Sequence, residues 1–275
     1  MSFRSIVLNL HELEMVEPLV NTAMAVGEAR RTHLIGVHSL PMAMNASAIP
    51  YYLPADVLQK IETSNVERAH EVHAKFNELT KSIDFPTEWF LHKGLAGSGT
   101  RDLIDHVLSA DLVVVSQHIR MSMPWLQRDL LQKSSTPILV APTTPVKPFR
   151  LGQITIAWNG SIQTARAIRD AMHMLEQADD VRVVCTGSES KSKEGQIAGS
   201  DVATWLSHHD ISVTLDEHLE RQLKTGVDVV ECAQDGGADL LVMGGYGHSP
   251  LYDAVVGGMT DDVLTNTSIP VFLSH

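Results

Sequence analysis

The sequence has few features of a membrane-embedded, secreted or disulfide-stabilised protein. It contains two cysteines, Cys185 and Cys232, which lie far apart and form no CxxC pattern. No apolar run approaches the roughly 18 residues that a membrane span requires. The first residues, Met-Ser-Phe-Arg-Ser, enter a strand pattern directly, without the long apolar core of a signal peptide. We therefore expect a protein of the reducing cytoplasm.

An excess of basic residues is also missing. Lysine and arginine number 21 against 33 aspartates and glutamates, which gives a formal net charge of −12 at pH 7. Nucleic acids and anionic membranes would repel such a protein, so we expect neither as a partner. The 275 residues, 44% of them hydrophobic, are enough for one large domain or two of average size.

Several motifs of nucleotide-binding and hydrolytic enzymes are absent. There is no GxxxxGK[ST] sequence, and Gly245-Tyr246-Gly247 lacks the third glycine of a dinucleotide fingerprint. No GxSxG nucleophile elbow occurs either. We accordingly predict no catalytic residue.

An internal repeat is present. Ile6-Val7-Leu8-Asn9-Leu10 followed by His11 matches Ile154-Thr155-Ile156-Ala157-Trp158 followed by Asn159. Ala110-Asp111-Leu112-Val113-Val114-Val115 matches Ala238-Asp239-Leu240-Leu241-Val242-Met243, and Ser135-Thr136-Pro137-Ile138 matches Ser268-Ile269-Pro270-Val271. Because the order is the same in both halves, the sequence predicts a duplicated domain.

Each half alternates short apolar runs with longer helical patterns, which is typical of an α/β fold with a parallel sheet. We predict strands near 4–9, 33–38, 87–91, 111–116 and 137–141, then near 153–158, 181–186, 211–216, 239–243 and 270–274. We predict helices near 13–30, 56–81, 99–109 and 126–134, then near 162–177, 193–208, 224–236 and 258–265. The prediction is two tandem doubly wound domains with five-stranded parallel sheets, 1–142 and 151–275. A proline-containing linker, 143–150, joins them.

A glycine-rich stretch follows the buried strand of the second half. Gly244, Gly245 and Gly247 come directly after the apolar run Leu240–Met243, and Gly257 and Gly258 precede a helical segment. Glycine amides at the carboxyl end of a strand, together with a helix N-terminus, suit a polyphosphate. The alternative is that these glycines only form turns. The corresponding loop of the first half, 116–124, contains no glycine.

This pattern resembles the universal stress protein family in its tandem form, over essentially the whole chain. Gly244, Gly247 and Gly257 stand at the spacing of the family's G-x2-G-x9-G-[S/T] nucleotide motif, but Gly258 occupies the place of the hydroxyl residue. Asn159 stands where ATP-binding members have an aspartate, and His11 replaces that aspartate in the first half. The resemblance implies an adenine nucleotide alpha-hydrolase-like fold and a nucleotide site at Ala157, Trp158, Asn159, Thr186, Met243, Gly244, Gly247, Gly257, Gly258, Met259 and Thr260.

The remaining polar residues have competing interpretations. His70 and His73 lie on one helix face, and we predict a solvated face there, with no metal site. Asp111 and Asp239 precede buried strands, where a carboxylate satisfies backbone donors, and we interpret both as structural. His248 and Ser249 beside the glycines, and Arg221 near the same edge, are either phosphate contacts or ordinary loop residues.

The leading hypothesis is a cytoplasmic stress-response protein whose C-terminal domain binds ATP, with or without Mg²⁺, and acts as a sensor with at most slow hydrolysis. The resemblance implies that the last strand of each domain forms the contact between the two domains, so that Pro137–Ala141 and Pro270–Ser274 are adjacent within the chain. It also suggests a homodimer of two such chains. A second hypothesis is a nucleotide-free scaffold that acts through dimerisation, and Gly258 and Asn159 motivate it. A third is an enzyme of the wider adenine-nucleotide superfamily, for which the sequence offers no acid–base pair.

Overall fold

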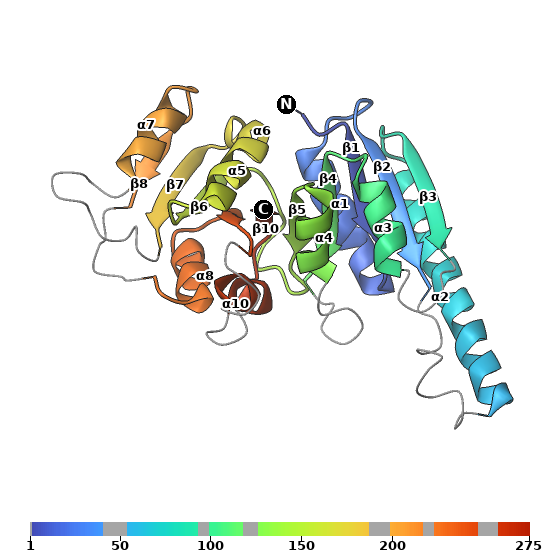
Figure 1. The fold of residues 1–275 in the computed structure, drawn as a ribbon. Coiled ribbons are helices and arrows are strands. Elements are labelled where there is room, and N and C mark those ends of the chain that lie inside the picture. The colour runs from blue at the N-terminus through green and yellow to red at the C-terminus, as the bar shows by residue number, and fades with distance from the viewer. Residues whose placement is uncertain are drawn as a thin grey trace. The chain divides into compact units, whose positions relative to one another are not determined.

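A computed structural model describes residues 2–40, 54–92, 99–117, 126–186, 199–216, 223–246 and 258–275 of the chain (Figure 1). The chain divides into two compact units. The N-terminal unit comprises Ser2–Ser116 and Met123–Thr136, and the C-terminal unit comprises Pro137–His275 together with Gln117–Ser122 and Met1.

The N-terminal unit alternates strands and helices along the chain, as the sequence predicts. Its elements are β1 (Ser5–Asn9), the 3-10 turn η1 (Leu13–Met15), α1 (Val16–Val26), β2 (His33–Ser39), α2 (Ala55–Thr80), β3 (Thr87–His92), α3 (Gly99–Val107), β4 (Leu112–Ser116) and α4 (Leu126–Ser134).

Four parallel strands of this unit form a sheet in the order β3-β2-β1-β4. Successive strand residues point to opposite faces of a sheet. Trp89 stacks on His73 of α2, with ring centroids 4.7 Å apart, whereas its neighbour Phe90 contacts His106 of α3 at 4.4 Å. Helices α2 and α3 therefore cover opposite faces, and the unit is doubly wound.

The C-terminal unit repeats this alternation. Its elements are β5 (Ile138–Ala141), β6 (Gln153–Trp158), α5 (Ile162–Asp170), α6 (Met172–Leu175), β7 (Asp180–Cys185), α7 (Ser200–Ser207), β8 (Val213–Leu215), α8 (Gly226–Asp235), β9 (Leu240–Gly244), α10 (Met259–Asn266) and β10 (Val271–Ser274).

The sheet of the C-terminal unit has the order β5-β10-β9-β6-β7-β8. Strands β6 to β10 are parallel to their neighbours, and β5 joins β10 antiparallel, with Val140 opposite Val271. The adjacency of the two halves' last strands is therefore confirmed. Residues of β9 and β10 are almost fully buried, which explains their uncharged, β-branched and leucine-rich sequences.

The two repeat-related aspartates occupy equivalent places at the amino ends of the sheets. Asp111 Oδ2 accepts hydrogen bonds from the backbone N–H groups of Arg4 (2.7 Å) and Ser5 (3.0 Å). Asp239 Oδ2 accepts one from Gln153 N–H (2.7 Å). Both carboxylates thus satisfy donors at the start of a neighbouring strand, and the structural interpretation of both is confirmed.

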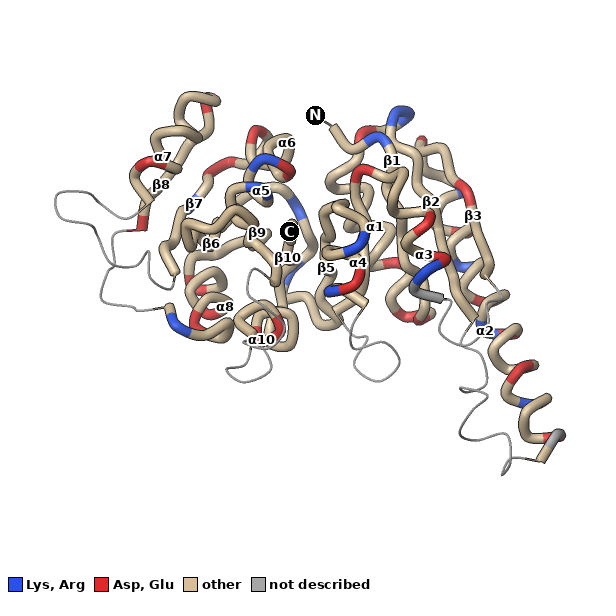
Figure 2. Tube along the Cα trace, in the orientation of Figure 1, with Lys and Arg blue, Asp and Glu red and all other residues tan. Residues whose placement is uncertain are grey.

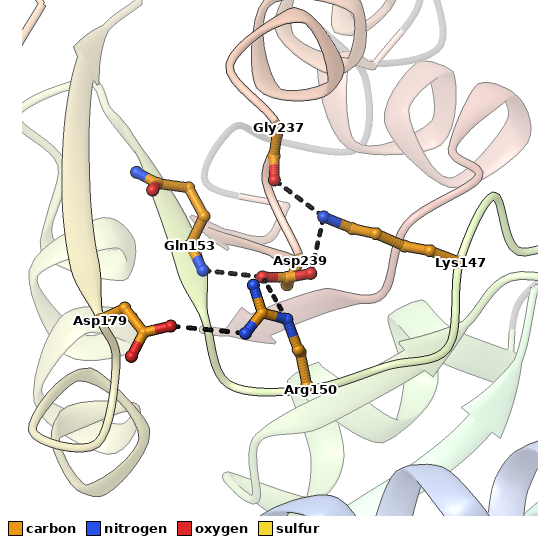
Figure 3. Close-up of polar contacts among 6 residues, drawn as sticks. All are labelled: Lys147, Arg150, Gln153, Asp179, Gly237 and Asp239. Atoms are coloured by element: carbon orange, nitrogen blue, oxygen red, sulfur yellow. Dashed lines mark hydrogen bonds and ion pairs between the residues drawn. The ribbon is translucent and has the colours of Figure 1, made fainter.

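Asp239 has an additional role because its side chain is fully buried. Lys147 Nζ lies 2.6 Å from Asp239 Oδ1 and also donates to Gly237 O (2.9 Å) (Figure 3). Arg150 Nε lies 3.7 Å from Asp239 Oδ2, and its guanidinium reaches Asp179 at 3.4 Å. Two cations of the proline-containing segment therefore neutralise a buried carboxylate that precedes β9.

Some predicted boundaries were wrong. The helix predicted near 13–30 is a 3-10 turn followed by α1, which ends at Val26 because Gly27 adopts an extended conformation and Phe3 bridges to it. The helix predicted near 162–177 breaks at Ala171 into α5 and α6. The strand predicted near 211–216 is shortened to β8.

Within the described residues, no helix combines the length and the apolar character needed to cross a membrane.

Candidate functional site

The predicted nucleotide residues that the structure describes meet at the carboxyl ends of β6, β7 and β9. The register places Ala157 beside Met243, Trp158 beside Cys185, and Ser274 beside Gly244. Helix α5 follows β6 and α10 follows the segment after β9, so the strand order reverses direction between β6 and β9. Such a switch point is where open α/β sheets bind ligands.

Asn159 is exposed and caps the start of α5. Its Oδ1 accepts hydrogen bonds from Ser161 N–H (3.1 Å) and from the Thr164 hydroxyl (2.5 Å). Ser161 completes the cap, since its Oγ accepts from Thr164 N–H (3.1 Å). The carbonyl oxygen of Asn159 is therefore engaged within the protein, which makes its amide NH₂ the group suited to a ligand.

Thr186 lies directly after β7 and is almost fully buried. Its backbone N–H donates to Trp158 O (2.8 Å), and its hydroxyl lies 3.4 Å from the same oxygen. These contacts continue the pairing of β7 with β6 by one residue. Thr186 thus lies at the carboxyl end of β7, beside the residue that precedes Asn159. The sequence predicted this position, at the end of the second strand of the repeat.

Gly244 allows a helix to approach a strand closely. A Cβ atom at this position would lie 2.6 Å from the backbone nitrogen of Thr164 and 2.8 Å from Gln163. The first turn of α5 therefore sits against the last residue of β9. A packing requirement explains Gly244 as well as ligand binding does, and no sequence pattern indicated that α5 would be its neighbour.

Tyr246, which follows β9, forms hydrogen bonds with the first turn of α10. Its backbone is left-handed (φ 50°), and its N–H lies 3.3 Å from the acceptor Thr260 Oγ1. Its phenolic hydroxyl donates to Asp261 Oδ1 (2.8 Å). Sequence reasoning missed Tyr246, although an aromatic residue inside a glycine run was the available signal. The Thr260 hydroxyl oxygen consequently serves as an acceptor within the protein, and its O–H is the part suited to donate to a ligand.

The first turn of α10 carries opposing electrostatic features. Gly258 is its N-cap and has no side chain, so this residue cannot cap the first backbone N–H groups of the helix. Uncapped donors and the positive end of the helix dipole attract anions. Asp261 and Asp262 lie in the same turn (Figure 2) and reduce that attraction.

Other predicted contacts lie outside the described residues. These are Gly247 and Gly257 of the motif, and His248, Ser249 and Arg221 near it. The structure brings Ala157, Trp158, Asn159, Thr186, Met243 and Gly244 together at the strand ends. Thr260 is joined to Tyr246, which follows β9, and Gly258 and Met259 precede Thr260 at the start of α10. The site as a whole stays a prediction.

The equivalent edge of the N-terminal unit has different chemistry. His11, which replaces the family's aspartate, lies beside His38, with ring centroids 5.7 Å apart. Burial, assisted by the neighbouring His38, lowers the pKa of His11 to about 4. The ring is therefore neutral at pH 7 and provides no positive charge for a phosphate.

The remaining candidates are explained by packing. His73 stacks on Trp89, and His209 packs edge-on against Trp205 at 4.8 Å. In the part of the chain that the structure describes, no group of three or more histidine, cysteine, aspartate or glutamate side chains is arranged to hold a metal ion. Cys185 and Cys232 form no disulfide bond with each other.

The C-terminal part of the chain matches a known protein family. Residues 151–275 match the sequence profile of the Universal stress protein family. Residues 151–275 form a Usp domain. This Usp domain coincides with β6 to β10 and contains the candidate site. No curated protein matches the sequence.

Solved structures resemble the whole chain in fold. A universal stress protein from Archaeoglobus fulgidus DSM 4304 has a TM-score of 0.67 at 11% identity and covers 98% of this chain and 95% of its own. A functionally unknown protein from Pseudomonas aeruginosa PAO1 gives 0.55 at 14%, with coverage of 99% and 92%. The cytoplasmic domain of a prokaryotic cation chloride cotransporter gives 0.52 at 7%, with coverage of 98% and 94%. The α/β fold predicted from the sequence is confirmed.

Proposed function

We propose that the chain is a tandem universal stress protein of the cytoplasm whose Usp domain binds ATP or a related adenine nucleotide as a sensor. The observation that carries the proposal is the N-terminus of α10, whose N-cap residue Gly258 has no side chain to cap it and which follows β9 beside the switch point of the sheet. Backbone donors at such a place suit a phosphate group. The equivalent hydrogen bonds of Asp111 and Asp239 support the proposal that the N-terminal half is a second copy of the same domain.

The groups around this edge suit binding better than catalysis. The amide of Asn159 can donate to a base or ribose oxygen, and the amides of Gly258 to Thr260 can contact phosphates. Neither asparagine nor threonine is a general base at neutral pH. We therefore propose at most slow hydrolysis, and Mg²⁺, where it takes part, would be bound mainly through the phosphates.

Titration of the full chain with ATP and Mg²⁺ tests this proposal. We expect saturable binding, and we expect Gly258→Ser to strengthen it by up to about tenfold, since a hydroxyl at the helix N-cap adds one hydrogen bond to a phosphate. Ser207→Ala, on α7, is the matched control, because its hydroxyl bonds only to Thr204 O nearby. Absence of binding at millimolar ATP, in both the wild type and Gly258→Ser, would refute the proposal.

A second candidate function is a nucleotide-free scaffold that works through homodimerisation. Asp261 and Asp262 in the first turn of α10 favour it, because they weaken phosphate binding. Protein taken directly from cells would then release no nucleotide on denaturation. Absorbance at 260 nm in the released fraction would contradict the scaffold function, and light scattering would report the dimer.

A further inference from the structure

A pair of histidines in the N-terminal unit lies apart from the proposed nucleotide site. His92 is the last residue of β3, and His106 lies in the last turn of α3. Their Nε2 atoms face each other at 2.8 Å, and both side chains are half-buried. The Phe90 ring packs against His106 with centroids 4.4 Å apart, which holds that imidazole in place.

This distance restricts the protonation of the pair. Two Nε2 atoms approach to 2.8 Å only when one carries a hydrogen and the other presents a lone pair. Burial and, to a smaller extent, the neighbouring His92 lower the pKa of His106. A metal ion could replace this hydrogen bond if the shared hydrogen moved to the opposite ring nitrogen and both rings turned, so that the two lone pairs pointed to one position off the line between the nitrogens.

The geometry also favours one class of metal ion. With metal–nitrogen bonds of about 2.0–2.1 Å, two ligands at 90° are roughly 2.9 Å apart, whereas tetrahedral ligands are roughly 3.4 Å apart. The observed 2.8 Å therefore fits adjacent positions of a square-planar or tetragonal site, as preferred by Cu²⁺ and Ni²⁺.

The charges around the pair favour a cation. Asp102 and Asp105 on α3, and Glu88 on β3, each act electrostatically on His106 and stabilise positive charge there. Glu88 also has a basic neighbour, since its Oε1 lies 3.8 Å from Nε2 of His33 on β2. Because no third protein ligand is in place among the described residues, water would complete the coordination, and the bound ion would exchange readily.

We propose that His92 and His106 form a two-histidine site for an exchangeable divalent transition-metal ion of the Cu²⁺ and Ni²⁺ class. The site draws its ligands from one strand and one helix of the N-terminal unit, so it does not depend on nucleotide binding by the Usp domain. It gives the N-terminal unit, whose glycine-free loop and neutral His11 do not suit a phosphate, a ligand of its own.

Titration of the full-length protein with Cu²⁺ at pH 7.5 tests the site, with free glycine present to suppress weak surface sites. We expect the first equivalent to show two imidazole nitrogens in its electron paramagnetic resonance spectrum. His92→Asn and His106→Asn should each weaken that first binding event by at least about tenfold and remove one nitrogen coupling. Thermal unfolding of each metal-free variant checks that the fold is kept.

His70→Asn is the matched control, because His70 is an exposed histidine on α2. It should leave the first equivalent unchanged. The proposal is overturned if both pair variants bind the first Cu²⁺ as the wild type does. It is equally overturned if one equivalent broadens the imidazole signals of other histidines and spares those of His92 and His106, since the pair would then hold only a proton.

Discussion

The electrostatic surroundings of two side chains in this protein could not be read from their neighbours in the sequence. Asp239 is fully buried, yet it is balanced by Lys147 and Arg150, which come from a segment about ninety residues earlier. His11 stands where the family's nucleotide-binding members have a carboxylate, yet burial keeps it neutral. Tertiary packing thus supplies the counter-ions of Asp239 and determines the charge state of His11.

Replacing Asp239 by asparagine should destabilise the protein by about 2–3 kcal/mol. The amide keeps an acceptor for Gln153 N–H but leaves Lys147 without a counter-ion in a partly desolvated place. Urea unfolding measures the change. Asp179→Asn, which removes only an exposed partner of Arg150, should change stability by less than about 0.5 kcal/mol. Equal effects of the two substitutions would contradict this assignment.

The pH dependence of stability should report His11. Its pKa is about 4 in the folded protein and about 6.5 when unfolded. The unfolded chain therefore takes up a proton first as the pH falls, and stability decreases from about pH 6.5 down to about pH 4.

The expected loss from His11 is about 2–3 kcal/mol between pH 7 and pH 4.5. Urea unfolding at both pH values should show a smaller decrease for His11→Gln than for the wild type. Identical decreases would show that His11 is not protonated preferentially in the unfolded chain.

At the scale of the element, glycines set how closely helices approach their neighbours. Gly244 admits the first turn of α5 against β9. Gly226, the first residue of α8, likewise lets α8 approach α10 closely, since a Cβ there would lie 2.4 Å from Met259 O. The elements that surround the candidate site are thus held by contacts too short for any other side chain.

We expect Gly244→Ala to lower the stability of the ligand-free protein by about 2–3 kcal/mol, because the new methyl group would displace α5. Gly237→Ala is a useful comparison. It meets no atom within 4 Å but has a left-handed φ of 72°, which costs roughly 1 kcal/mol. If Gly244→Ala left apo stability unchanged and only weakened ATP binding, the glycine would serve the ligand alone.

Sequence patterns predicted element types better than element contacts. Apolar runs such as Leu240–Met243 specify buried strands because both of their faces are covered. The end of α1 at Val26 was missed because the helical pattern continues past it, while the extended Gly27 and its bridge to Phe3 depend on tertiary packing. The hydrogen bond from the Tyr246 hydroxyl to Asp261 was missed for the same reason, since it joins residues that lie 15 positions apart in the sequence.

At the scale of the whole molecule, the C-terminal unit is larger than its Usp domain. Strand β5 and the cations Lys147 and Arg150 precede residue 151 but belong to the unit through β10 and Asp239. A fragment of residues 151–275 would expose the edge of β10, including the fully buried Phe272, and exposed edges of this kind associate.

We therefore predict that a fragment of residues 137–275 is more soluble and more stable than one of residues 151–275. Light scattering and thermal unfolding of both fragments provide the measurement. A shorter fragment that is monomeric and equally stable would show that β5 and the two cations contribute little.

The pairing of β5 with β10 also affects how the protein is made. The two strands lie about 130 residues apart, and β10 ends one residue before the last residue of this sequence. On a ribosome, β5 emerges long before its antiparallel partner has been translated. It must wait through the synthesis of the entire Usp domain with that edge unpaired, so nascent chains stalled within residues 151–270 should be especially dependent on chaperones.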